Sequence, residues 1–249
     1  MRLFLHELRG ELLLYSRSRE LAFFTFLLPM ILFVLLGSAY GDEDIEGIRG
    51  SDYLMAGTIG YGVAATAFAG LAIVLVLRRE EGILKRLRAT PLPAPVYIAA
   101  MLITTLVAFI LQAVCTVALA MVVFDASAPD NAPSLVAALV LGAASFAALG
   151  VALTGFVRRA EGASAVVNAI YFPMLFISGS FFSQDTFPPV LQAVADVLPL
   201  TYFIQLVTAV AVRGQEIWER PTDVAVLAGW GAVGAVLALR RFRWTPTEG

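Results

Sequence analysis

The chain has 249 residues, of which 59% are hydrophobic and 14% charged, and its formal net charge is -2. A soluble domain of this length needs a polar surface that so few charges cannot supply, and the mean hydropathy of +0.84 agrees. The composition therefore excludes a soluble fold and predicts an all-α integral membrane protein. The near-zero net charge gives no basis for expecting a nucleic-acid partner.

The first 20 residues (1–20) predict an amphipathic helix that lies at the membrane interface. Its basic residues, such as Arg9 and Arg17, fall largely off one apolar stripe, which is the pattern of a helix in the headgroup plane. A soluble arm packed on a partner is the alternative. The stripe consists of Phe4, Leu5, Leu8, Leu12 and Tyr15.

Residues 21–249 predict a transmembrane domain with six spans. Each segment is apolar and about as long as a hydrocarbon core of ~30 Å requires. Pro29 should kink the first span, and the small residues Gly57, Gly60 and Ala64 of the second let helices approach closely. The spans are Leu21–Tyr40, Tyr53–Leu77, Val96–Phe124, Ser134–Val157, Ala163–Phe182 and Val224–Leu239.

The region between the fifth and sixth spans, residues 183–221, predicts a re-entrant helix pair. Phe187–Val197 contains two prolines and an aspartate, and Leu200–Val212 is too short to cross the membrane. A seventh span would also deliver Arg240 and Arg241 to the outside.

The basic residues then fix the topology. With six spans, all but three of the 17 Lys and Arg residues lie on one side, the exceptions being Arg49, Arg213 and Arg220. The positive-inside rule assigns that side to the cytoplasm. We therefore expect a multi-pass protein of the cell (plasma) membrane with both termini cytoplasmic, whose basic segments contact the lipid bilayer.

The densest charge cluster is the loop 78–95 between the second and third spans. After Gly82, apolar residues recur at helical spacing while basic residues project elsewhere, until Thr90-Pro91 ends the pattern. This predicts a short amphipathic helix under the membrane with a basic face for a soluble partner. An ordinary positive-inside loop is the alternative. The apolar residues are Ile83, Leu84 and Leu87, and the basic ones Lys85, Arg86 and Arg88.

Two stretches carry a family resemblance. Glu81-Gly82-Ile83-Leu84-Lys85-Arg86-Leu87-Arg88-Ala89-Thr90-Pro91-Leu92 resembles the cytoplasmic loop between the second and third helices of ABC-2 type transporter permeases. Phe172-Pro173-Met174-Leu175-Phe176-Ile177-Ser178-Gly179-Ser180-Phe181-Phe182, followed by Leu198-Pro199-Leu200-Thr201-Tyr202, is similar to the C-terminal signature of the same family. The resemblance covers essentially the full length, and the short external loops exclude members with large extracellular domains.

The resemblance implies the permease subunit of an ATP-driven exporter of a drug, antibiotic or lipid. It also implies a second permease copy, identical or related, and a separate ABC ATPase subunit docked on a coupling helix. The chain lacks a Walker A pattern, so we expect ATP on that partner, no cofactor bound directly and no enzymatic activity here. Polysaccharide or glycolipid export, and a non-transporting scaffold or sensor that docks a soluble partner, are alternatives. The expected coupling residues are Glu81, Gly82, Leu84, Arg86, Leu87 and Arg88.

The spans themselves lack ionisable groups away from their ends. This disfavours ion-coupled transport and a channel with a charged ring, so the driving energy should come from outside the membrane. No catalytic or metal-binding constellation is evident, and the only histidine is His6. Mild polarity marks a candidate path for an amphipathic or lipid-like substrate, although each polar group could instead only bond a neighbouring helix. The candidate path residues are Gln112, Asn168, Tyr171, Ser178 and Tyr202.

Overall fold

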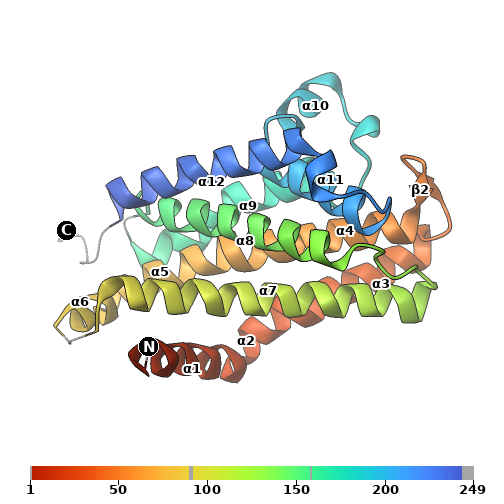
Figure 1. Ribbon diagram of the computed structural model, residues 1–249. Coiled ribbons are helices and arrows are strands. Elements are labelled where there is room, and N and C mark those ends of the chain that lie inside the picture. Colours follow the sequence, from red (N-terminus) through yellow and green to blue (C-terminus); the bar gives the residue numbers. More distant parts are fainter. Residues whose placement is uncertain (1, 90–91, 158, 243–249) are drawn as a thin grey trace.

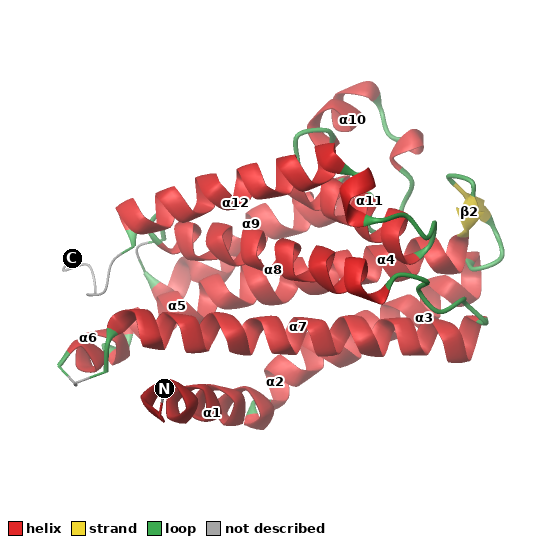
Figure 2. Ribbon diagram, viewed as in Figure 1, coloured by secondary structure: helices red, strands yellow, loops and turns green. Residues whose placement is uncertain are grey.

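A computed structural model describes residues 2–89, 92–157 and 159–242 of the chain. These residues form a bundle of long helices lying side by side (Figure 1), and a short hairpin supplies the strand content of the described part (Figure 2). The all-α membrane fold with six spans is confirmed. The helices long and apolar enough to cross a membrane, among the described residues, are Arg19–Tyr40, Gly50–Glu80, Pro95–Phe124, Ala132–Thr154, Ala160–Ile177 and Pro221–Arg241.

The chain begins with α1 (Arg2–Arg17), which lies beside the bundle next to α7 (Figure 1). The first span follows as α2 (Arg19–Ala22), η1 (Phe23–Leu27) and α3 (Leu28–Tyr40). The η1 segment is π-helical and comes immediately before Pro29. Because proline has no N–H to continue the α-helical pattern, the backbone adjusts locally at this position.

The second span occupies the centre of the bundle and is the most buried of the six. It consists of α4 (Gly50–Val63), a second π-helical segment η2 (Ala64–Gly70) and α5 (Leu71–Glu80). Its small residues bring neighbouring backbones close, because a Cβ built on Gly57 would lie 1.6 Å from the carbonyl oxygen of Ser180.

The remaining spans are α7 (Ala94–Phe124), α8 (Ala132–Thr154), α9 (Ala160–Ile177) and α12 (Pro221–Arg241). Helices α8 and α12 lie against each other (Figure 1). Their backbones approach closely where a Cβ on Gly234 would lie 2.7 Å from the amide nitrogen of Leu149. Such a contact supplies packing energy that lipid, being as apolar as the helices, cannot replace.

The fifth span ends at Ile177, five residues before the boundary expected from hydropathy, which is a correction to the predicted span. Gly179 has a φ of +81°, which breaks the helix into a turn. The hydroxyl of Tyr53 donates to the carbonyl oxygens of Gly179 at 2.6 Å and Phe182 at 3.1 Å. Residues 178–182 therefore form a turn held against α4 and do not continue the helix.

The next region contains η3 (Gln184–Thr186) and the pair α10 (Pro189–Ala195) and α11 (Pro199–Ala211), bent by 77°. Helix α11 is buried between α4, α8 and α12. Since α9 ends and α12 begins at the same end of the bundle (Figure 1), the pair returns to the end from which it starts, as the re-entrant prediction requires.

That end also carries the hairpin β1 (Asp44–Ile45) and β2 (Ile48–Arg49) and the short helix η4 (Ile217–Glu219). The opposite end carries α6 (Ile83–Arg88), the start of α1 and the end of α12 (Figure 1). The predicted helix stop at Thr90-Pro91, and the basic residues Arg158 and Arg243, lie outside the described residues.

Candidate coupling site and translocation groove

Helix α6 has the amphipathic character expected of a coupling helix. Leu84 is fully buried, whereas Lys85 and Arg86 are exposed. Gly82 separates α6 from α5. Its φ of +70° is a backbone conformation that favours glycine. Glu81 is exposed, and its carbonyl oxygen accepts a hydrogen bond from Arg86 Nη2 at 3.2 Å. The side chains of Leu87 and Arg88 lie outside the described part of the structure.

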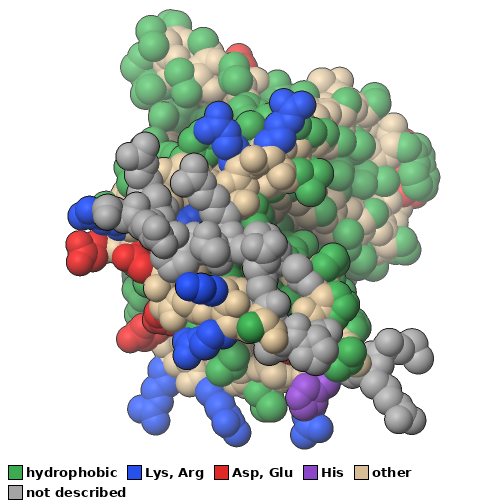
Figure 3. Space-filling view, turned by 90° about the vertical axis from the view of Figure 1, so that its left-hand side faces the viewer, with side chains coloured by type: hydrophobic (Ala, Val, Ile, Leu, Met, Phe, Trp, Pro, Cys, Tyr) green, Lys and Arg blue, Asp and Glu red, His purple; other side chains and the backbone are tan. Residues whose placement is uncertain are grey.

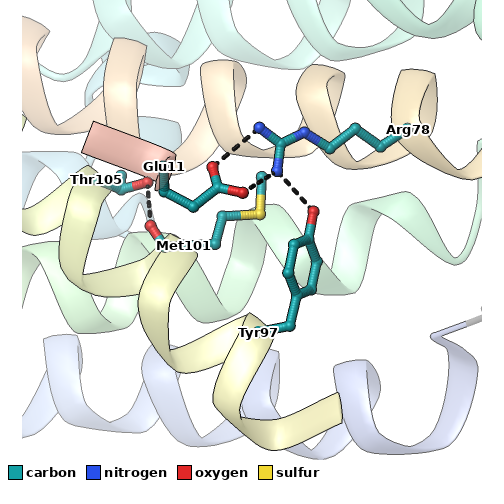
Figure 4. A network of polar contacts seen from close by, with 5 residues as sticks. All are labelled: Glu11, Arg78, Tyr97, Met101 and Thr105. Atoms are coloured by element: carbon teal, nitrogen blue, oxygen red, sulfur yellow. Dashed lines mark hydrogen bonds and ion pairs between the residues drawn. The ribbon is translucent and has the colours of Figure 1, made fainter. Parts of the chain in front are cut away.

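The last turn of α5, immediately before α6, is tied to α1 and α7. Arg78 Nη1 and Nη2 donate to the two carboxylate oxygens of Glu11 on α1 at 2.5 and 2.9 Å (Figure 4). Arg78 Nη1 also donates to the hydroxyl of Tyr97 on α7 at 2.6 Å (Figure 4). We name Glu11, Arg78 and Tyr97 the root network, because it lies at the base of α6. Its three residues come from three helices and are largely buried.

The next two residues tie the same turn to α8 and α9. Arg79 is 3% exposed and donates from Nη1 to the carbonyl oxygen of Thr154 at 2.8 Å and from Nη2 to that of Val157 at 2.5 Å. These carbonyls lie at the end of α8 and just beyond it, where the helix cannot satisfy them itself. The carboxylate of Glu80 accepts the amide of Ala160 at the start of α9. Three consecutive residues thus connect the base of α6 to four other helices.

Glu11 was not among the residues expected from sequence, and the predicted stripe of α1 needs correction. Leu5 and Leu12 are exposed, whereas Glu11 is 6% exposed and lies on the inner face, three residues after Leu8 and four before Tyr15. The Tyr15 hydroxyl is 2.7 Å from Thr25 Oγ1 in η1, and burial raises the pKa of this phenol. The helical spacing from Leu8 to Tyr15 is the signal that could have revealed the buried acid.

A groove of about 850 Å³ extends from the base of α6 towards the opposite end of the bundle. Glu81 and Ile83 line it at one end, and Phe181 and Phe182 line it beyond the end of α9. Both π-helical segments contribute to its wall. It opens at the bundle surface, since several of its rings are about half exposed. Its further aromatic lining residues are Tyr15, Phe24, Tyr61, Tyr171, Phe172 and Phe176.

A few polar atoms in this apolar wall have no partner among the described residues. Tyr171 is 4% exposed and Thr104 is 3% exposed, and the Thr104 hydroxyl is not hydrogen-bonded within the described part. The half-buried Asn168 also lines the groove, and its amide makes no hydrogen bond to any described residue. An apolar wall with a few convergent polar groups is typical of a site for an amphipathic molecule.

The other three candidate path residues do not line this groove. Gln112 is fully buried between α7 and α4, with its amide nitrogen 3.0 Å from Thr116 Oγ1. Ser178 is buried in the turn after α9. The Tyr202 hydroxyl donates to the carbonyl oxygen of Asp196 at 2.7 Å, joining α11 to the residue after α10. Of the predicted path, the structure therefore brings together Asn168 and Tyr171.

The end of the bundle that carries α6 also gathers basic side chains (Figure 3). The opposite end carries exposed Asp42, Glu43 and Asp44 around the hairpin. Among the described residues, no group of three or more His, Cys, Asp or Glu is placed to hold a metal ion. The exposed basic residues of the α6 end include Arg9, Lys85, Arg86, Arg159, Arg240 and Arg241.

Comparison with known proteins agrees with these features. The family described as ABC-2 type transporter matches residues 2–212. The "Putative transport permease YvfS" of Bacillus subtilis (strain 168) is 28% identical over 152 residues, 61% of each chain. The "Daunorubicin resistance ABC transporter permease protein DrrB1" of Streptomyces coeruleorubidus is 26% identical over 227 residues, 87% of this chain and 77% of that protein. The chain belongs to the ABC-2 type transporter family and is a transmembrane subunit of an ABC transporter, whose ATP hydrolysis resides in a separate ATPase.

Proposed function

We propose that the protein is the permease subunit of an ATP-driven exporter that moves an amphipathic or lipid-like substrate out of the cytoplasm or the inner leaflet. The observation that carries this proposal is the groove, which begins beside α6 and continues towards the opposite end of the bundle. Its wall is mostly apolar and includes polar groups of Thr104, Asn168 and Tyr171, of which those of Thr104 and Asn168 lack partners within the described residues. Such a wall accepts a large apolar body and a few polar groups, and it suits neither a bare ion nor a sugar.

The orientation follows from the charges at the two ends. The end with α6 is basic and the end with the hairpin is acidic, so the positive-inside rule assigns the α6 end, with both termini, to the cytoplasm of a cell membrane. A cytoplasmic ATPase would meet α6 at this face. Lys85 and Arg86 would contact it, while the buried Leu84 anchors α6 to the bundle.

A displacement of α6 can reach the groove through the helices that are bonded to its base. The turn that precedes α6 is bonded to α1, α7, α8 and α9, so a displacement of α6 would move these helices together. Interfaces of this kind change between discrete arrangements, which is how a small push becomes a larger opening. The groove is formed by one chain, and we propose that a second copy, identical or related, completes the pathway.

The name of the Streptomyces relative provides a probe. The name of that protein refers to daunorubicin resistance. Daunorubicin is a planar aromatic amphiphile, which matches a groove lined by aromatic rings. We therefore propose daunorubicin as a fluorescent test substrate, without assigning it as the natural one.

The test uses the complex with its co-purified ATPase in proteoliposomes. Leu84→Pro breaks a helix of six residues, and Arg86→Glu reverses a charge on its exposed face. Normalised to the ATPase that each variant retains, ATP hydrolysis should continue while daunorubicin transport falls by roughly 5- to 150-fold, the range of a coupling free energy of about 1–3 kcal/mol. Arg240→Glu, at the same end but on α12, is the matched control and should transport normally. Normal transport by an inserted Leu84→Pro protein would contradict the proposal.

A further inference from the structure

The root network joins the two helices that flank α6. Arg78 belongs to α5, which leads into α6, and Tyr97 belongs to α7, which follows the coupling loop. Glu11 adds α1, which packs along α7. The described hydrogen bonds between α1 and α5 are those of Glu11 with Arg78. Without this ion pair, α1 would keep its contact with α7 and lose its polar attachment to α5.

The position of the ion pair makes it more than a packing contact. The side chains of Glu11 and Arg78 are 7% and 17% exposed, so the pair is shielded from water and both carboxylate oxygens are engaged. A buried bidentate pair of this kind fixes geometry strongly, because loss of one partner leaves the other charge uncompensated. It therefore sets the distance between α1 and the base of α6.

Helix α1 in turn reaches the groove. Its Tyr15 hydroxyl is bonded to Thr25 in η1, and both residues line the groove, as do Glu11 and Arg78. A displacement of α5 can thus pass through Glu11 to α1 and through Tyr15 to the wall of the first span. Helix α1 also exposes Leu3, Leu5 and Leu13, which do not line the groove and suit contact with lipid.

We propose that Glu11 is a positioning residue, which locks α1 to the base of α6 so that both move as one body when the ATPase acts. This inference rests on the proposed function, since it needs an ATPase to drive α6. The amphipathic helix α1 then takes part in transmission, through the ion pair of Glu11 with Arg78. The pair touches no reacting atom and acts through helix position.

The experiment measures the position of α1 directly. Spin labels are attached at two exposed positions, by Leu13→Cys on α1 and Val236→Cys on α12, in a chain whose Cys115 is replaced by alanine. The complex with its ATPase is studied in nanodiscs, without nucleotide and trapped with ATP and vanadate. We expect trapping to shift the distance between labels in the otherwise unchanged protein. Glu11→Gln should lose the shift while ATP hydrolysis continues.

Two further variants separate positioning from general damage. Exchanging the charges, with Glu11→Arg and Arg78→Glu together, keeps the summed side-chain length, and the Tyr97 hydroxyl can donate to a carboxylate as readily as it accepts from a guanidinium. The exchange should restore the shift. Glu7→Gln is the matched control, because Glu7 lies one turn earlier on α1 and forms no ion pair with the described residues.

The outcomes distinguish the two proposals. A wild-type shift in Glu11→Gln, or an equal loss in Glu7→Gln, would overturn the role of Glu11 and leave the exporter proposal standing. Labels that do not move in the unchanged protein would also overturn it, while hydrolysis in the same sample tests the exporter proposal independently. Loss of the shift in Glu11→Gln with recovery in the charge exchange would support the inference.

Discussion

Replacing Arg79 by methionine should destabilise the bundle strongly. Arg79 is 3% exposed, and it donates to the carbonyl oxygens of Thr154 and Val157. A hydrogen bond from a charged donor contributes about 1.5–3 kcal/mol, so the loss of both costs roughly 3–6 kcal/mol. Relief from burying the charge offsets part of this cost. The melting temperature should fall on the order of 10 °C, since each kcal/mol corresponds to about 2–4 °C at this chain length.

The measurement is the fraction of monodisperse protein that survives heating in detergent, followed by size-exclusion chromatography. Arg79→Lys keeps the charge but lacks the forked guanidinium that reaches both carbonyl oxygens. Its melting temperature should therefore lie between those of the unchanged protein and Arg79→Met. Arg86→Met is the control, because Arg86 is exposed and the one hydrogen bond that its side chain makes to a described residue is 3.2 Å long. Its free energy of unfolding should change by no more than about 0.5 kcal/mol. A melting temperature of Arg79→Met equal to that of Arg86→Met would refute the reasoning.

Two other predictions concern the turn after α9 and the groove. Gly57→Ala places a methyl group 1.6 Å from the Ser180 carbonyl oxygen and should lower the free energy of unfolding by about 1–3 kcal/mol, whereas Gly162→Ala meets nothing within 4 Å and should not. Equal melting temperatures of Gly57→Ala and Gly162→Ala would contradict this, because they would show that the turn after α9 shifts to accommodate the methyl group. Asn168→Leu should raise the KM for daunorubicin transport, whereas Gln112→Leu, buried away from the groove, should leave it unchanged. A changed KM in Gln112→Leu but not in Asn168→Leu would show that the substrate passes beside Gln112 and not through the groove.

The span count and the re-entrant pair were predictable because both depend on the length of apolar segments. The end of the fifth span was not, because Phe181 and Phe182 extend the charge-free segment beyond Ile177, and hydropathy does not distinguish a helix from a buried turn. The one local signal was Gly179, whose φ of +81° allows that turn. The hydroxyl of Tyr53 that holds it comes from α4, far away in sequence.

The candidate site was predictable to the extent that it depends on one helix at a time. The spacing of Leu84, Lys85 and Arg86 was sufficient to predict which side of α6 is buried. Gln112 and Asn168 could not be separated in the same way, because each is a polar residue in an apolar helix and only the neighbouring helices decide which one faces the groove. The burial of Glu11 depends on Arg78, a partner that periodicity in α1 does not reveal.

The central claim is that α6 docks on a separate ATPase. The most direct measurement is gentle purification of the full chain from native membranes, with quantification of its partners by mass spectrometry, for the unchanged protein and for Arg86→Glu. We expect an ABC ATPase to be recovered near one-to-one with the unchanged chain and to be depleted with Arg86→Glu. Folded, monodisperse chain recovered without any ATPase would contradict the claim and would favour a membrane scaffold.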